Sequence, residues 1–342
     1  MRQRRALNLF GLSLAAVAIG ALAVRNLSAA APISLLNASY DPTRELYAQL
    51  NPLFIKEHKA STGERVEIKQ SHGGSSRQAR AVIDGEHAAD VVTFGLPSDV
   101  EVLRKRGLVG NKWSERLPND SRPYTSTIVF VVRAGNPFKI HDWPDLLQPD
   151  VEIITPDPRS SGNGKLSALA AWGTVLLRGG SEADAQAYLK QFYEHAPFLE
   201  PAARGAALAF AIEKLGDVHL AWENEALREA SESKGALEIV YPPLSIVAEP
   251  SVAWVDSNVG KHHTQALAKA YLEFLFSEQA QEVIAQNGYR PFDAKVLARH
   301  SKSFPDLKLF SITAIAKDWD DAQQKFFAEN GIIDTVYKPK PR

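Results

Sequence analysis

The sequence predicts an α/β protein of two lobes, each built around a largely parallel sheet. A chain of 342 residues is long enough for two domains. Short β-rich runs alternate with helical patterns along it, which is typical of α/β units. Two apolar runs, residues 126–132 (STIVFVV) and 245–255 (SIVAEPSVAWV), flank a central block of about one domain's length. If the chain crosses between lobes at these runs, lobe one takes both flanks and lobe two the middle.

These crossings give the expected organisation. It is a signal segment at 1–30, the first part of lobe one at 31–125, lobe two at 126–248, and the second part of lobe one with a C-terminal helical tail at 249–342. Expected strands are 33–36, 66–69, 90–94, 151–155, 218–221 and 237–241. The clearest helical patterns are 42–58 and 264–287.

The N-terminal segment has the pattern of a secretory signal peptide. A basic start, Met1–Arg5, precedes an uncharged apolar run, and small residues lead up to Ala30. This order predicts export with cleavage near Ala30. The uncharged run is also long enough to span a bilayer, so an uncleaved anchor is the alternative.

Composition excludes several classes of function. The formal net charge is −1, so bulk charge gives no reason to expect nucleic-acid binding. Cysteine is absent, which rules out thiol catalysis, disulfides and attachment through a lipidated cysteine. The adjacent His262 and His263 lack ligand spacing, so no metal or cofactor is expected.

Four turns share one local pattern, in which a strand leads through small residues into a helix. They are ASYDPTRE at 38–45, SHGGSS at 71–76, PRSSGNGK at 158–165 and AARGA at 202–206. Asp41 and Ser75 are expected to cap the helices that follow them. In an α/β sheet such turns lie at the carboxyl ends of strands, and helix starts offer unpaired N–H groups there. Two turns come from each lobe, which predicts an anion site in the cleft between them.

The residue types favour a fully ionised anion. Among the three turns 71–76, 160–164 and 202–206 there is no Asp or Glu, and the Asp41 carboxylate is expected to cap its own helix. Sulfate only accepts hydrogen bonds, whereas phosphate usually keeps a proton and benefits from an acceptor. Leaving an acceptor buried and unpaired costs on the order of 1–3 kcal/mol. Trp222, at the end of an apolar strand, could add an indole N–H, which is only a donor.

Enzymatic interpretations fit less well. The HGG turn could serve a secreted hydrolase as an oxyanion hole, but the chain has no G-x-S-x-G elbow. Gly164-Lys165 is followed by Leu166 and position 159 is Arg, so the phosphate-loop pattern fails twice. His72 is therefore expected to be a turn residue and not a base.

The strings LLNASYDPTREL, QSHGGSSRQA, ITPDPRSSG, AARG and AWENEAL carry a family resemblance. With them the chain resembles the periplasmic sulfate/thiosulfate-binding proteins of ABC importers, a branch of the two-lobed periplasmic binding proteins. The likeness runs from about Leu35 to near residue 336. It implies a type II fold: two Rossmann-like lobes, a ligand cleft and two crossover segments.

The resemblance also implies how each site residue acts. Backbone amides would come from Asp41, Ser75, Gly162, Asn163 and Ala203, a hydroxyl from Ser161 and an indole N–H from Trp222. The residues around them would be His72, Gly73, Gly74 and Arg204.

The implied protein is a periplasmic receptor that captures sulfate, and thiosulfate as well, and delivers it to the membrane permease of an ABC importer. It would be a monomer with no enzymatic activity, no cofactor and no nucleic-acid partner. Three positions depart from the family pattern: Asn163 stands where a second glycine is usual, Ala202 where glycine is frequent, and Ala206-Ala207 where hydroxyl residues are common. These departures keep molybdate or phosphate open as the ligand.

Overall fold

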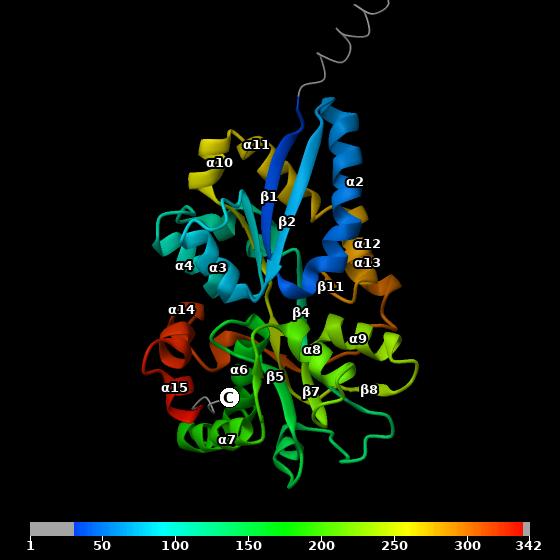
Figure 1. The fold of residues 1–342 in the computed structure, drawn as a ribbon, viewed down its shortest axis with the longest axis vertical. Coiled ribbons are helices and arrows are strands. Elements are labelled where there is room, and N and C mark those ends of the chain that lie inside the picture. The colour runs from blue at the N-terminus through cyan, green and yellow to red at the C-terminus, as the bar shows by residue number, and fades with distance from the viewer. Residues whose placement is uncertain (1–30, 338–342) are drawn as a thin grey trace, which may run out of the picture.

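Two sheets form two lobes, one above the other in Figure 1. The structure is a computed structural model and describes residues 31–337. The expected signal segment and the last residues, 338–342, lie outside the described residues. Within the described range, no helix is both long and apolar enough to cross a membrane.

Lobe one is built on a four-stranded sheet in the order β10-β3-β1-β2. Its strands are β1 (Ile33–Tyr40), β2 (Val66–Gly73), β3 (Val91–Phe94) and β10 (Ser251–Trp254). β1 runs parallel to both β2 and β3, and β10 pairs antiparallel with β3. β1 and β2 extend beyond the predicted strands, and residues 38–40 and 71–73, expected in turns, are their last residues. The prediction that His72 is a turn residue is therefore wrong, because it pairs with Ser39 in the ladder of β1 and β2.

Helices surround this sheet. They are α2 (Arg44–Thr62), α3 (Ser75–Ile83), α4 (Pro97–Lys105), α5 (Pro118–Ser121), α10 (Asp256–His262), α11 (Gln265–Phe274), α12 (Glu278–Gln286) and α13 (Ala294–Arg299), with short 3₁₀ helices η1 (Asp41–Thr43) and η2 (Trp113–Arg116). The long helix predicted at 264–287 is two helices. Ser277 interrupts it, because its hydroxyl accepts from Ala280 N (3.2 Å) and caps α12.

Lobe two is built on a larger sheet with β4 (Tyr124–Arg133) near its centre. The other strands are β5 (Ile153–Pro156), β6 (Leu199–Glu200), β7 (Val218–Trp222), β8 (Leu237–Val240), β9 (Ser245–Ala248) and β12 (Leu309–Phe310). The short β11 (Arg290–Pro291) pairs with the first two residues of β4, at the junction of the lobes. β5 is parallel to β6 and β7, but β4 is antiparallel to β7, β8 and β9. The prediction of a largely parallel sheet is therefore wrong for lobe two. β4 enters the sheet from lobe one, whereas β5 and β7 run back toward the cleft.

The helices of lobe two carry the rest of the chain. They are α6 (Gly162–Leu176), α7 (Glu182–Glu194), α8 (Ala203–Ala211), α9 (Glu223–Glu232), α14 (Trp319–Ala322) and α15 (Ile332–Val336), with η3 (Trp143–Leu147), η4 (Ile312–Ala314) and the π-helical η5 (Gln323–Phe327). α6 is buried along most of its length. Its Trp172 packs edge-on against Phe326 of η5, with ring centroids 5.1 Å apart, so the C-terminal segment closes over this helix.

The chain crosses between the lobes at the two predicted apolar runs, and it also crosses at a third, unpredicted place. It enters lobe two at the start of β4 and leaves between β9 and β10, around Glu249 and Pro250. Residues 300–308 then return it from α13 to β12, which pairs with β9. The structure thus adds a third crossing to the two expected. It also places the C-terminal helices α14 and α15 beside lobe two (Figure 1).

Candidate functional site

The predicted site residues gather where the two lobes meet. We call Asp41, Ser75, Ser161, Gly162, Asn163, Ala203 and Trp222 the donor cluster; all seven are buried. Arg204 N, next to Ala203, donates to Asp41 Oδ2 across the cleft (3.0 Å). A Cβ added at Gly162 would lie 3.4 Å from Ser75 Cβ and 3.7 Å from the Trp222 ring. The structure therefore brings together segments that are far apart in the sequence.

Three helices start at this cluster, and none of them is capped by the side chain of its own N-cap residue. α3 begins at Ser75, α6 at Gly162 and α8 at Ala203. In the described part of the chain no side chain accepts from the first-turn amides of α3 and α6, whereas at α8 the carboxylate of Asp41 accepts from Arg204 N. The first N–H groups of a helix have no partner within the helix, and they carry its positive dipole end. The uncapped starts of α3 and α6 converge in a buried place with the first amide of α8, and together they form a site suited to an anion.

Two predicted caps are wrong, and the correction is informative. Gly74, and not Ser75, is the N-cap of α3, while Ser75 Oγ accepts from Gly95 N (3.0 Å). Asp41 does not cap the helix that follows it either. Its Oδ1 accepts from Arg44 Nε and Nη2 (3.0 and 2.8 Å), and its Oδ2 accepts from Arg204 N in the first turn of α8. Asp41 therefore caps a helix of the opposite lobe.

Both Asp41 carboxylate oxygens thus accept hydrogen bonds, one from Arg44 and the other from Arg204 N of lobe two. The prediction that this carboxylate is engaged elsewhere agrees with the geometry, although its partner differs. The cluster consequently presents N–H and O–H donors. Among the described residues, no group of three or more His, Cys, Asp or Glu side chains is arranged to hold a metal ion.

Two side-chain donors complete the cluster. Within residues 31–337, no recorded hydrogen bond engages the Ser161 hydroxyl or the Trp222 indole N–H, although both residues are almost fully buried. The Trp222 ring is held from the lobe-one side by Tyr40, at 5.5 Å between centroids. A Cβ at Gly95 would lie 3.2 Å from the same ring, so glycine makes room for the indole there.

The residues around the donor cluster, His72, Gly73 and Gly74 at the end of β2 and Arg204 of α8, have distinct roles. A Cβ at Gly74 would lie 2.4 Å from Ser160 O, so this glycine lets the two lobes approach closely. Gly73 packs against Gln78. His72 is half-buried; burial and, next, the Arg44 guanidinium lower its pKa, which favours the neutral ring. The Arg204 side chain lies 3.3 Å from Glu45 of lobe one.

A buried ion pair that sequence reasoning missed lies beside the cluster. Lys165 Nζ of α6 lies 3.1 Å from Asp99 Oδ1 of α4, and both side chains are about 95% buried. Ser76 Oγ, next to Ser75, donates to the same Asp99 oxygen (2.8 Å), and Lys165 also donates to Gln323 (3.0 Å). The pair ties the start of α3 to the start of α6. Nothing in the local sequence links positions so far apart.

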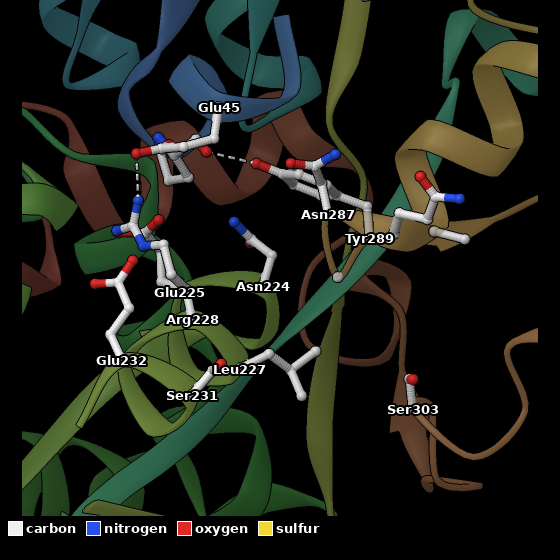
Figure 2. A pocket seen from close by; sticks show the side chains of 14 residues that line it. Glu45, Asn224, Glu225, Leu227, Arg228, Ser231, Glu232, Asn287, Tyr289 and Ser303 are labelled. Carbon is white, nitrogen blue, oxygen red and sulfur yellow. Dashed lines mark hydrogen bonds and ion pairs between the residues drawn. The ribbon is translucent and has the colours of Figure 1, made fainter. Parts of the chain in front are cut away.

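Residues of both lobes, among them Glu45 and Asn224, also line a polar cavity of about 360 Å³ (Figure 2). Glu45 of α2 reaches down to Arg228 of α9 (2.6 Å), which also pairs with Glu225 (2.8 Å). Burial raises the pKa of Glu225 to about 8, against the opposing effect of Arg228. This network is a second set of contacts between the lobes.

The chain is similar to known proteins in sequence. The sequence pattern described as bacterial extracellular solute-binding protein matches residues 35–290. The sulfate-binding protein of Salmonella typhimurium is 48% identical over 308 residues, covering 90% of this chain and 93% of that protein. The thiosulfate-binding protein of Pseudomonas aeruginosa is 43% identical over 307 residues, covering 89% and 92%.

A solved structure agrees with these relatives. The sulfate-binding protein SubI from Mycobacterium tuberculosis superposes with a TM-score of 0.78 at 32% identity, covering 86% of this chain and 99% of that one. The two-lobed fold, the matched sequence pattern and the relatives point the same way. The chain belongs to the family of bacterial extracellular solute-binding proteins.

Proposed function

We propose that this protein is a receptor for sulfate, and also for thiosulfate, and that the donor cluster holds the anion. One observation carries the proposal: the starts of α3, α6 and α8 converge with the free Ser161 hydroxyl and Trp222 indole at the junction of the lobes. Amides of Asp41, Ser75, Gly162, Asn163 and Ala203 would act with these two side chains. Its relatives include proteins named for each of these anions.

The engaged Asp41 carboxylate supports sulfate over phosphate. Both of its oxygens already accept hydrogen bonds, so the cluster offers no free carboxylate to the proton of hydrogen phosphate. Such an unpaired O–H would lose on the order of 1–3 kcal/mol in a buried site. Binding makes and breaks no covalent bond in this proposal, so the protein is not an enzyme.

The proposal extends to the transport pathway. The named relatives are anion receptors, and the N-terminal signal pattern favours export, so we place the protein in the periplasm as a monomer. Its partner would be the membrane permease of an ABC importer. The lobes touch through Asp41, Lys165 and Glu45, and this closed shape is what the permease would recognise.

Titration calorimetry of the extensively dialysed protein with sulfate, thiosulfate, molybdate and phosphate tests this directly. We expect one-to-one binding of sulfate and thiosulfate, with little heat from phosphate. Tighter binding of phosphate or molybdate would mean that the protein is a receptor for a different anion from the one proposed. No response to any of the four anions would contradict the proposal.

A further inference from the structure

The β5–β7 ladder stops one rung before the donor cluster, and the sequence explains why. Ile153 pairs with Val218 and Ile154 with His219, and Val218 N donates to Glu152 O (3.3 Å). In a parallel ladder, alternate residues of one strand turn both backbone groups toward its neighbour. Val218, Leu220 and Trp222 therefore face β5.

Continuing this register, residue 156 would donate to Leu220 O and accept from Trp222 N. Residue 156 is a proline, which has no N–H to donate. The next rung of the ladder is thus missing at the point where β7 delivers Trp222. Leu220 and Trp222 are buried, so water is poorly placed to satisfy their backbone groups.

The Asn163 side chain fills this gap. It is 1% exposed, and one terminal atom of its amide lies 3.1 Å from both Leu220 O and Ser167 Oγ, while the other lies 3.3 Å from Trp222 N. We assign the nitrogen to the first position and the oxygen to the second, because this orientation of the amide pairs both backbone groups of β7. A side-chain amide has the same donor and acceptor as a backbone peptide, so this one can replace the missing peptide of β5.

The position of Asn163 follows from close packing between α6 and β5. A Cβ at Gly164 would lie 2.3 Å from Pro156 O, so the first turn of α6 sits directly on the end of that strand. Gly164 permits this approach, and the neighbouring Asn163 then reaches across to β7. Asn163 is also the second residue of α6, in the uncapped first turn whose amides belong to the donor cluster.

We infer that Asn163 is a positioning residue that fixes the Trp222 indole relative to the amides of α6, and that this rigid spacing discriminates between sulfate and thiosulfate. The inference rests on the proposed function. Both anions are tetrahedral dianions, but the terminal sulfur of thiosulfate is larger and its bond longer than those of an oxygen. Two donors tied to one side chain cannot easily spread to accommodate that difference.

Amide hydrogen exchange on the ligand-free protein tests the contact between the Asn163 side chain and the backbone of Leu220 and Trp222, which we call the clamp, independently of any anion. In the wild type, we expect Trp222 N–H to exchange about as slowly as Leu220 N–H. In Asn163→Ala, exchange of Trp222 N–H should accelerate at least about tenfold, while amides of β4 keep their rates. Rapid Trp222 exchange in the wild type would overturn the inference even if the variant failed to fold.

Calorimetry with the two anions tests the discrimination. Asn163→Ala should weaken the better-bound anion about tenfold and the other one less, so that the ratio of the two affinities moves toward one. Ser167→Ala is the matched control, because it removes a contact of the same amide without touching β7, and it should behave like the wild type. Equal losses for both anions, or unchanged Trp222 exchange in Asn163→Ala, would overturn the inference. If the wild type bound neither anion, the proposed function would fail while the exchange result still tested the clamp.

Discussion

The two lobes contribute to the donor cluster in different ways. Lobe two supplies the starts of α6 and α8 together with Trp222, and within this lobe the Asn163 side chain connects α6 to the strand of Trp222. Lobe one supplies Asp41 and Ser75 from the ends of β1 and β2, and these meet lobe two only through contacts across the cleft. The comparison suggests that the lobe-two half is assembled within its own lobe, whereas the lobe-one half becomes part of the site by closure. Changes to cross-lobe contacts should then affect affinity more than folding.

The largest expected effect comes from Lys165→Met, which leaves the Asp99 carboxylate without its cation whenever the lobes are closed. Losing one partner of a buried pair should weaken sulfate binding by about 3 kcal/mol, roughly a hundredfold. Opening the cleft returns Asp99 to water, so the free energy of unfolding without sulfate should change less. Calorimetry and urea unfolding measure the two quantities. Adding Asp99→Asn should recover much of the affinity; no recovery would argue against the pair as the cause.

Gly74→Ala should hinder closure directly. Its new Cβ would meet Ser160 O at 2.4 Å, a backbone atom that cannot simply rotate away. Overpacking of this kind should reduce sulfate affinity by about 2 kcal/mol, roughly thirtyfold. Gly260→Ala is the matched control, because a Cβ there meets nothing within 4 Å. Equal affinities for the two variants would mean that closure at Gly74 is not required.

Trp222→Phe tests the lobe-two half by removing only the indole N–H and part of the ring. Sulfate affinity should fall by about 1.4 kcal/mol, roughly tenfold, because one donor to the anion is lost. Ser161→Ala should have a similar effect for the same reason. Both are measured by calorimetry, with circular dichroism as the folding control. Wild-type affinity in both variants would remove these side chains from the proposed site.

The smallest effect expected is a pH dependence due to Glu225 at the lobe junction. Burial raises its pKa from the ordinary 4.5 to about 8, with Arg228, Glu229, Arg204 and Glu45 around it. The folded protein therefore holds this proton more tightly than the unfolded chain does. Its contribution to stability is full below about pH 4.5 and is lost as the pH rises through about 8.

Urea unfolding at several pH values measures this contribution. From about pH 7 to about pH 8 the free energy of unfolding should fall by about 1 kcal/mol more in the wild type than in Glu225→Gln. Glu232→Gln, on the exposed side of the same helix, is the control and should keep the wild-type slope. Identical slopes for the wild type and Glu225→Gln would assign the pH dependence to other groups.

Local sequence patterns predict most of the fold, and together with the family resemblance they single out the residues that the structure brings together as the donor cluster. Their binding of an anion stays a prediction. Strand starts at Ile33, Val66 and Val218 were correct because alternating or continuous apolar runs report burial directly. The cap assignments of Asp41 and Ser75 were wrong because a capping residue and a residue bonded to the opposite lobe have the same local sequence. The Lys165–Asp99 pair and the Asn163 amide were missed because both depend on contacts that span many residues.

The third crossing has a practical consequence for observing this molecule. β1 begins at the outer end of lobe one (Figure 1). Because residues 300–308 carry the chain back to lobe two, α15 instead ends beside lobe two. A fluorescent donor attached at Ile33 and an acceptor attached at Asp334 would therefore be on different lobes. Energy transfer between them would follow opening and closing in real time, which makes the chain a natural scaffold for an optical sensor of its own ligand.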